Sequence, residues 1–70
     1  MKDYVVLKMH WNSEREECDI DYDWQFDDEE EAMSFAESLL LEVNECVEVQ
    51  EYDEVTETFE TILFIKGGNK

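Results

Sequence analysis

Five carboxylates in the segment "ECDIDYDWQFDDEEEA", residues 17–32, have the spacing of a calcium-binding loop. Asp19, Asp21 and Asp23 fit loop positions one, three and five, Asp27 fits nine, and Glu30 fits twelve, where a bidentate glutamate binds the ion. Position six needs glycine for a sharp turn, but here it is Trp24. Five matching acids are weak support when 21 acids share 70 positions, so we expect no specific calcium site and no other metal site.

The same segment alternates between apolar and acidic residues with period two, which is typical of a strand. The apolar parity consists of Cys18, Ile20, Tyr22, Trp24 and Phe26. Alternate side chains of a strand lie about 6.8 Å apart on one face. Asp19, Asp21 and Asp23 are therefore expected to form a straight row of negative groups. The distance between neighbours in this row is comparable to that between neighbouring phosphates along a DNA strand. The hypothesis requires all three to share one surface.

Further acids extend this pattern. Asp27, Asp28, Glu29 and Glu30 are expected to continue the first row at the start of a helix, and a second row is expected from Glu48, Glu51, Asp53, Glu54, Glu57 and Glu60. Carboxylates accept bidentate hydrogen bonds from arginine, as phosphates do. A DNA-binding protein depends on Lys and Arg to neutralise phosphates, so an acidic protein that aligns with those cations competes with DNA.

The hydrophobic pattern predicts the elements that position these acids. Strands are expected at 3–11, 17–26, 45–52 and 55–66. Between the second and third, an apolar stripe from Ala32 to Val43 predicts a helix, with Asp28 as N-cap, Glu31 as its capping-box partner and Asn44 as the stop. The fold class is α+β in the order β-β-α-β-β, a four-stranded antiparallel sheet with one helix packed on one face. Residues 1–66 form a single acidic domain, and 67–70 a flexible C-terminal tail.

The alternation also assigns residues to the two faces of the sheet. The parity of Val5, Leu7, Met9 and Trp11 is expected to face the helix, and Trp24 and Cys18 are expected in the same core. His10 is expected at the surface or in an interface. One helix cannot cover both faces, so the apolar residues of the outer face predict a homodimer; these are Tyr4, Val6, Ile62 and Phe64. The alternative is a small exposed patch.

The charge balance narrows the function classes. The chain has 21 acids against five Lys and Arg, a formal charge of −16, and no Lys or Arg between Glu16 and Ile65. Such charge weakens the folded state by self-repulsion and exceeds what solubility needs. The negative field is therefore interpreted as functional, with a halophilic surface or a cation buffer as alternatives. No signal peptide is recognised and the two cysteines have no metal-type spacing, so we expect reduced thiols in the cytoplasm, no cofactor and no membrane partner.

The chain lacks a phosphate-binding glycine loop and has a single histidine, so no enzyme is predicted. In small size, acidity and expected layout it resembles the DNA-mimic inhibitors encoded by bacteriophages, among them an early protein of a lytic Bacillus phage that inhibits the nucleoid protein HU. The resemblance implies a basic host DNA-binding protein as partner and no direct nucleic-acid binding. Anti-CRISPR proteins and inhibitors of uracil-DNA glycosylase or restriction enzymes share these features.

A second hypothesis assigns the contact to the apolar outer face. The chain would then be an acidic interaction module of anti-CRISPR, antitoxin-like or sigma-factor-binding type. Two sets of substitutions separate the hypotheses. Charge reversal to Lys at Asp19, Asp21 and Asp23 should abolish binding by a DNA mimic. Substitution of Ile62 and Phe64 should matter more if the contact is the apolar outer face.

Overall fold

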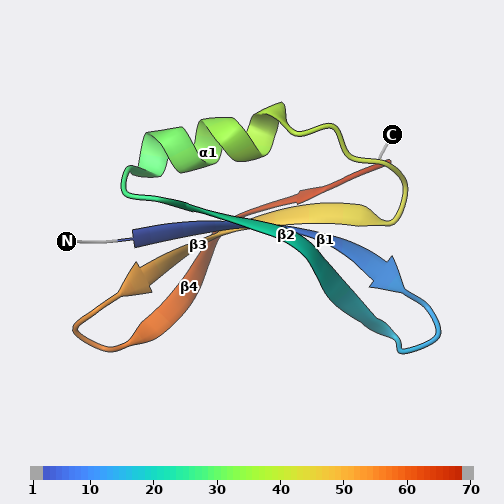
Figure 1. Cartoon of the computed structure of the whole chain (residues 1–70), viewed down its shortest axis with the longest axis horizontal. Coiled ribbons are helices and arrows are strands. Elements are labelled where there is room, and N and C mark those ends of the chain that lie inside the picture. The colour runs from blue at the N-terminus through green and yellow to red at the C-terminus, as the bar shows by residue number, and fades with distance from the viewer. Residues whose placement is uncertain (1–2, 69–70) are drawn as a thin grey trace.

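The computed structural model describes residues 3–68 and contains five elements (Figure 1). They are β1 (Asp3–Asn12), β2 (Glu17–Phe26), α1 (Glu29–Ser38), β3 (Glu45–Asp53) and β4 (Thr58–Lys66). The strands form one antiparallel sheet in the order β2-β1-β3-β4. Helix α1 lies across one face of this sheet (Figure 1). The predicted α+β fold with one helix on a four-stranded antiparallel sheet is confirmed.

The core lies between α1 and the two central strands. We call the sheet face under α1 the covered face and the opposite one the open face. Val6, Val47 and Val49 are fully buried there beneath Ala32 and Ala36 of the helix. Two aromatic rings of β2 pack around the helix residue Phe35, with ring centroids 4.7 Å away for Trp24 and 5.3 Å away for Phe26. The small alanine side chains let the helix backbone lie close to the valines, as close packing of the core requires.

Helix α1 begins as predicted and ends earlier than predicted. The Asp28 side chain accepts a hydrogen bond from the Glu31 backbone N–H at 3.0 Å, so the predicted N-cap is confirmed. The helix ends at Ser38, since the next residue, Leu39, has an extended backbone (φ −72°, ψ 138°) and its N–H donates to the Ala36 carbonyl. The predicted continuation to Val43 is wrong. Leu40 and Val43 are exposed in the connection to β3.

A register shift in each hairpin moves residues between the faces. The β1–β2 pairing joins Lys8 to Tyr22 but Met9 to Ile20, so Asp21 is an extra residue in a β-bulge. The β3–β4 pairing shifts in the same way between Val49 and Gln50 and leaves Ile62 as the extra residue. Because β1 pairs regularly with β3, the faces can be read from β1 for every strand.

The predicted orientation of β1 is wrong. Tyr4 and Val6 lie on the covered face and are 7% and 0% exposed, so they are core residues and not part of an outer dimer interface. Ile62 also packs against this core, and Phe64 lies on the open face as predicted. Val5, Leu7, Met9 and Trp11 occupy the open face instead, because the helix packs over the start of β1, where Tyr4 and Val6 present the other parity.

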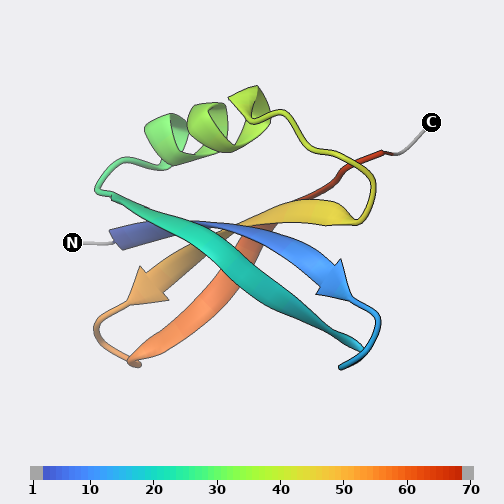
Figure 2. The ribbon, with the colours of Figure 1, turned by 45° about the vertical axis from the view of Figure 1, so that its right-hand side comes forward.

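The sheet is strongly twisted, with both hairpin tips bent away from α1 at opposite ends (Figures 1 and 2). This shape is the saddle produced by the ordinary twist of strands. At the C-terminal end, the backbone N–H of Gly67 donates to the Glu45 carbonyl at 2.8 Å. A Cβ at Gly67 would approach Leu41 Cβ to 2.5 Å, so the close passage of these two segments requires glycine. The rest of the expected tail, residues 69–70, lies outside the described residues.

Candidate functional site

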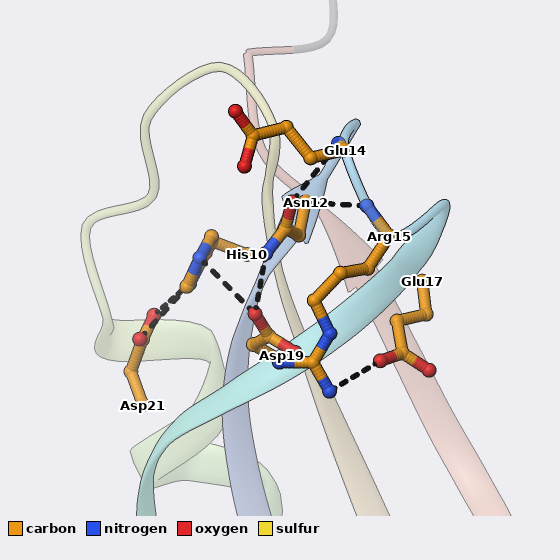
Figure 3. A network of polar contacts seen from close by, with 7 residues as sticks. All are labelled: His10, Asn12, Glu14, Arg15, Glu17, Asp19 and Asp21. Carbon is orange, nitrogen blue, oxygen red and sulfur yellow. Dashed lines mark hydrogen bonds and ion pairs between the residues drawn. The ribbon is translucent and has the colours of Figure 1, made fainter.

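Polar residues gather at the tip of the β1–β2 hairpin in a network that we call the hairpin cluster (Figure 3). Its members are His10, Asn12, Arg15, Glu17, Asp19 and Asp21. His10 Nδ1 lies 2.9 Å from both carboxylate oxygens of Asp21, and Arg15 Nη2 lies 2.6 Å from Glu17 Oε2. Asn12 donates to Asp19 at 2.9 Å and accepts from two backbone N–H groups of the turn. These contacts hold the hairpin tip together.

The bulge at Asp21 breaks the predicted first row of acids. Asp19 pairs with His10 on the covered face, whereas Asp23 pairs with Leu7 on the open face. Asp21 turns toward His10 as well. The prediction that Asp19, Asp21 and Asp23 form one straight row on one surface is therefore wrong. Two of the three also have partners within the fold, because His10 contacts Asp19 and Asp21, and Arg15 Nη1 lies 3.8 Å from Asp19.

The predicted second row is divided as well. Glu48 lies on the open face, where it accepts hydrogen bonds from Gln50 and Thr61 at 3.0 Å. Glu51 and Glu60 face each other across β3 and β4 on the covered face. Asp53 closes the following turn by accepting from the Val55 backbone N–H at 2.9 Å, and Glu54 and Glu57 lie in that turn. The six predicted residues therefore occupy both faces and a hairpin tip, and do not form one row.

The densest group of acids surrounds the start of α1, and we call it the helix-start cluster. It consists of Asp27, Asp28, Glu29, Glu30 and Glu31, all exposed. No ion pair with a described Lys, Arg or His residue reaches any of these five acids. The positive end of the helix dipole and the backbone N–H groups stabilise them locally. Their charge therefore projects outward without a compensating cation among residues 3–68.

Tyr4 joins this cluster to the sheet. Its hydroxyl donates to Glu51 Oε2 at 3.3 Å. Burial raises the pKa of the Tyr4 phenol, and the carboxylates of Glu51 and Glu29 raise it further. An acidic hollow of about 430 Å³ lies beside the cluster and is lined by Asp3, Gln25, Phe26, Asp27 and Glu31. The acids of this end thus come from β1, the β2–α1 connection, α1 and β3, which the packing of the core holds in place.

The described cations are concentrated away from this end. Lys8 Nζ forms an ion pair with Glu45 Oε2 at 2.9 Å. The pKa of Glu45 is lowered first by a hydrogen bond from the Glu42 backbone N–H and then by the hydrogen bond from Lys8. The hydrogen bond between Lys8 and Glu45 in turn raises the pKa of Lys8. Arg15 belongs to the hairpin cluster. Among residues 3–68 the charge is therefore asymmetric, with paired acids near the hairpin tip and the start of β3, and acids without a described ion pair at the helix start.

The two cysteines of the chain lie close to each other on the open face. No group of three or more His, Cys, Asp or Glu side chains within residues 3–68 is arranged to hold a metal ion. Cys18 and Cys46 are both free thiols. Cys46 is buried on the open face, and its pKa is raised to about 11 by burial and by nearby Cys18. Cys18 was expected in the core, but the bulge turns it onto the open face, where it is exposed.

Sequence reasoning missed four residues that shape the acidic surfaces. Asp3 and Glu31 line the acidic hollow, and Asn12 and Arg15 organise the hairpin cluster. The capping pattern identified Glu31 as a helix residue but did not point to the hollow. Asn12, three residues before Arg15 in a polar turn, carried a usable signal, because Asn commonly caps such turns through its side chain.

Comparison of the chain with protein-family models, with curated proteins and with solved structures finds no match. Within residues 3–68, no helix has the length and apolar character needed to cross a membrane.

Proposed function

We propose that this chain is a DNA-mimic inhibitor, which occupies the cationic DNA-binding surface of a host DNA-binding protein and displaces DNA. The contact surface is the helix-start cluster with Glu51 and Glu60, in place of the row first expected along β2. The observation that carries the proposal is the concentration of exposed acids at the helix start without a described ion pair. A surface of this kind is complementary to a groove lined with Lys and Arg.

The chemistry of the proposed contact is charge exchange. A cationic groove binds DNA largely because phosphate neutralisation releases counterions. Exposed carboxylates on a rigid framework offer the same cations an alternative partner, with bidentate geometry for arginine. Helix-start acids are held by the N-cap and by the packing of α1, so little ordering is required on binding. A nucleoid protein such as HU is the favoured partner, following the resemblance in composition to phage inhibitors.

A competition experiment tests the proposal. The chain is immobilised, exposed to bacterial lysate at low salt, and eluted with duplex DNA. The expected result is retention of a basic DNA-binding protein that DNA releases, with affinity falling steeply as salt is raised. The mimic hypothesis is rejected if no such protein is retained, or if DNA fails to release the protein that is.

The alternative is an acidic interaction module that uses the open face. It is favoured by four large exposed apolar side chains there, Trp11, Ile20, Phe59 and Phe64. Binding through this face depends on apolar contact and is weakly affected by salt. Retention of a lysate protein that DNA does not release, and that a Phe64→Asp substitution abolishes, distinguishes this module from the mimic.

A further inference from the structure

The open face of the sheet is an apolar surface that helix α1 leaves uncovered (Figure 1). Its central strand presents Val5, Leu7, Met9 and Trp11, and the register adds Ile20, Tyr52, Phe59 and Phe64 from the other strands. Four of these side chains are about half exposed: Trp11 by 46%, Ile20 by 57%, Phe59 by 58% and Phe64 by 55%. A row of large apolar side chains on one face marks an interaction surface.

Acids are largely excluded from this face. The strand register places three of the 21 acids on it, namely Asp3, Asp23 and Glu48. Glu48 is also hydrogen-bonded to Gln50 and Thr61. A basic partner drawn by the charge of the molecule is steered to the helix side, since the field is strongest there. The open face, on which the register places these three acids and Lys66, instead matches a surface that is itself mainly apolar.

We propose that a second copy of this chain covers the open face, giving a symmetric dimer in which two sheets pack face to face and both α1 helices point outward. This inference does not depend on the proposed function. The interface includes Trp11, Ile20, Phe59 and Phe64, and so differs from the surface expected from the sequence. It also includes an apolar hollow of about 350 Å³ to which Trp11, Cys46 and Phe64 contribute, and which a side chain of the other copy can enter.

The shape of the sheet fits a second copy. A half-turn about a line that runs along a strand brings a saddle-shaped surface back onto itself, with the body of the molecule on the other side. Two such sheets therefore fit face to face, in the near-aligned packing of β-sandwiches. Four strands about 4.8 Å apart and about 30 Å long present roughly 600 Å² per copy. Two copies would bury roughly 1,200 Å², the lower limit for a specific dimer.

The dimer also separates like charges. With the open faces joined, the helix-start clusters of the two copies lie on opposite outer surfaces, because α1 covers the other side of each sheet (Figure 1). Repulsion between two chains of charge −16 still opposes association. The dimer dissociation constant should therefore fall as salt is raised from about 20 mM to about 300 mM, the range over which screening becomes strong.

Sedimentation equilibrium of the full chain tests the proposal. The expected mass is twice the 8.4 kDa of one chain. Phe64→Asp on β4 and Ile20→Asp on β2 should each raise the dissociation constant at least about 30-fold, as expected for interface anchors. Leu40→Asp is the matched control, since Leu40 is 92% exposed outside the sheet, and should leave the constant within about threefold. Circular dichroism shows which variants are folded, and one folded variant of the two, Phe64→Asp or Ile20→Asp, is enough to test the interface.

Two results overturn the proposal. One is that the chain sediments as a monomer at 1 mM in 0.3 M salt. This holds also where the monomer binds a different protein through Phe64, because the open face then serves another partner. The other is a dimer that neither folded face variant weakens, because a surface other than the open face then joins the copies.

Discussion

The two acidic clusters, at opposite ends of the molecule, hold their carboxylates in different ways. At the hairpin tip, His10 and Arg15 are interleaved with Glu17, Asp19 and Asp21, so attraction between neighbours stabilises the turn (Figure 3). At the helix start, five consecutive acids rely on backbone N–H groups and the helix dipole. Arg15 pairs with acids of the hairpin cluster, whereas the acids of the helix-start cluster are exposed and have no described ion pair.

Net charge alone does not show which acids of this fold have ion-pair partners. Both clusters are acidic in sequence, and the β2 acids have the more regular spacing. Ion pairs within the fold decide which acids remain available, and they include a local pair, Arg15 with Glu17, and a pair distant in the chain, Lys8 with Glu45. Screening limits the outward field to about 8 Å at physiological salt, so the availability of nearby carboxylates matters more than the total charge.

The largest expected effect comes from neutralising three acids of the helix-start cluster, with three acids near the hairpin tip neutralised as the control. One variant carries Glu29→Gln, Glu30→Gln and Glu31→Gln; the matched control carries Glu14→Gln, Glu16→Gln and Glu17→Gln. Each removes three negative charges. The helix-start variant should weaken binding to the retained DNA-binding protein by at least about 100-fold, because each lost charged hydrogen bond is worth about 1.5–3 kcal/mol.

The control variant should change that affinity by at most about threefold, since Glu17 is already paired with Arg15 and long-range attraction is screened. Titration calorimetry at fixed salt compares the two variants. An equal loss in both would mean that total charge, and not the helix-start cluster, determines binding.

The next effect concerns the support of the helix-start cluster. Asp28→Ala removes the acceptor for the Glu31 N–H and should lower the free energy of unfolding by about 1 kcal/mol. Asp28→Asn retains a good N-cap acceptor without the charge, and should lose less than half as much. Urea unfolding followed by circular dichroism gives both values. If Asn were as destabilising as Ala, attraction of the carboxylate to the helix dipole would outweigh the hydrogen bond.

Much of the fold was predictable from the sequence because local signals agreed with the final structure. The residues of β2, the order of elements and the Asp28 cap follow from alternation, from a change of period and from capping chemistry. The early end of α1 was not predictable in the same way. Leu39 and Leu40 continue the apolar stripe, and the extended backbone of Leu39, at which the helix ends, leaves no mark in hydrophobic periodicity.

The faces and the candidate site were less predictable, since a bulge changes the face of a strand without changing its letters. Alternation normally fixes the face, because a shift of one residue exposes the core residues. Here the open face is also apolar, so Cys18 and Ile20 can leave the helix side without disturbing the pattern. The location of acids without a partner depends in turn on contacts across strands, such as that of His10 with Asp21, which no local spacing encodes.

A smaller effect should appear in the pH dependence of Glu45→Gln. The folded-state pKa of Glu45 is lowered by the Glu42 backbone N–H and by Lys8, so its stabilising contribution is present above the ordinary glutamate pKa and is lost as pH falls through the folded value. The difference in unfolding free energy between the wild type and Glu45→Gln should therefore shrink on acidification. Urea unfolding at pH 7 and pH 3 measures it. Glu14→Gln, in the exposed turn, should show a smaller change, and an equal change would indicate general charge relief.

The smallest effect tests the helix-start field through Tyr4. Its pKa is raised first by burial and then by Glu51 and Glu29, so the neutral phenol favours the folded state, and that contribution disappears as pH rises through the folded pKa. Glu29→Gln should lower the Tyr4 pKa without returning it to the ordinary value, because burial persists. Glu17→Gln, at the hairpin tip, should not change it. Ultraviolet titration in a Tyr22→Phe, Tyr52→Phe background isolates this phenol. Equal shifts from both substitutions would show that Tyr4 senses the charge of the whole molecule and that the two clusters are not electrostatically distinct.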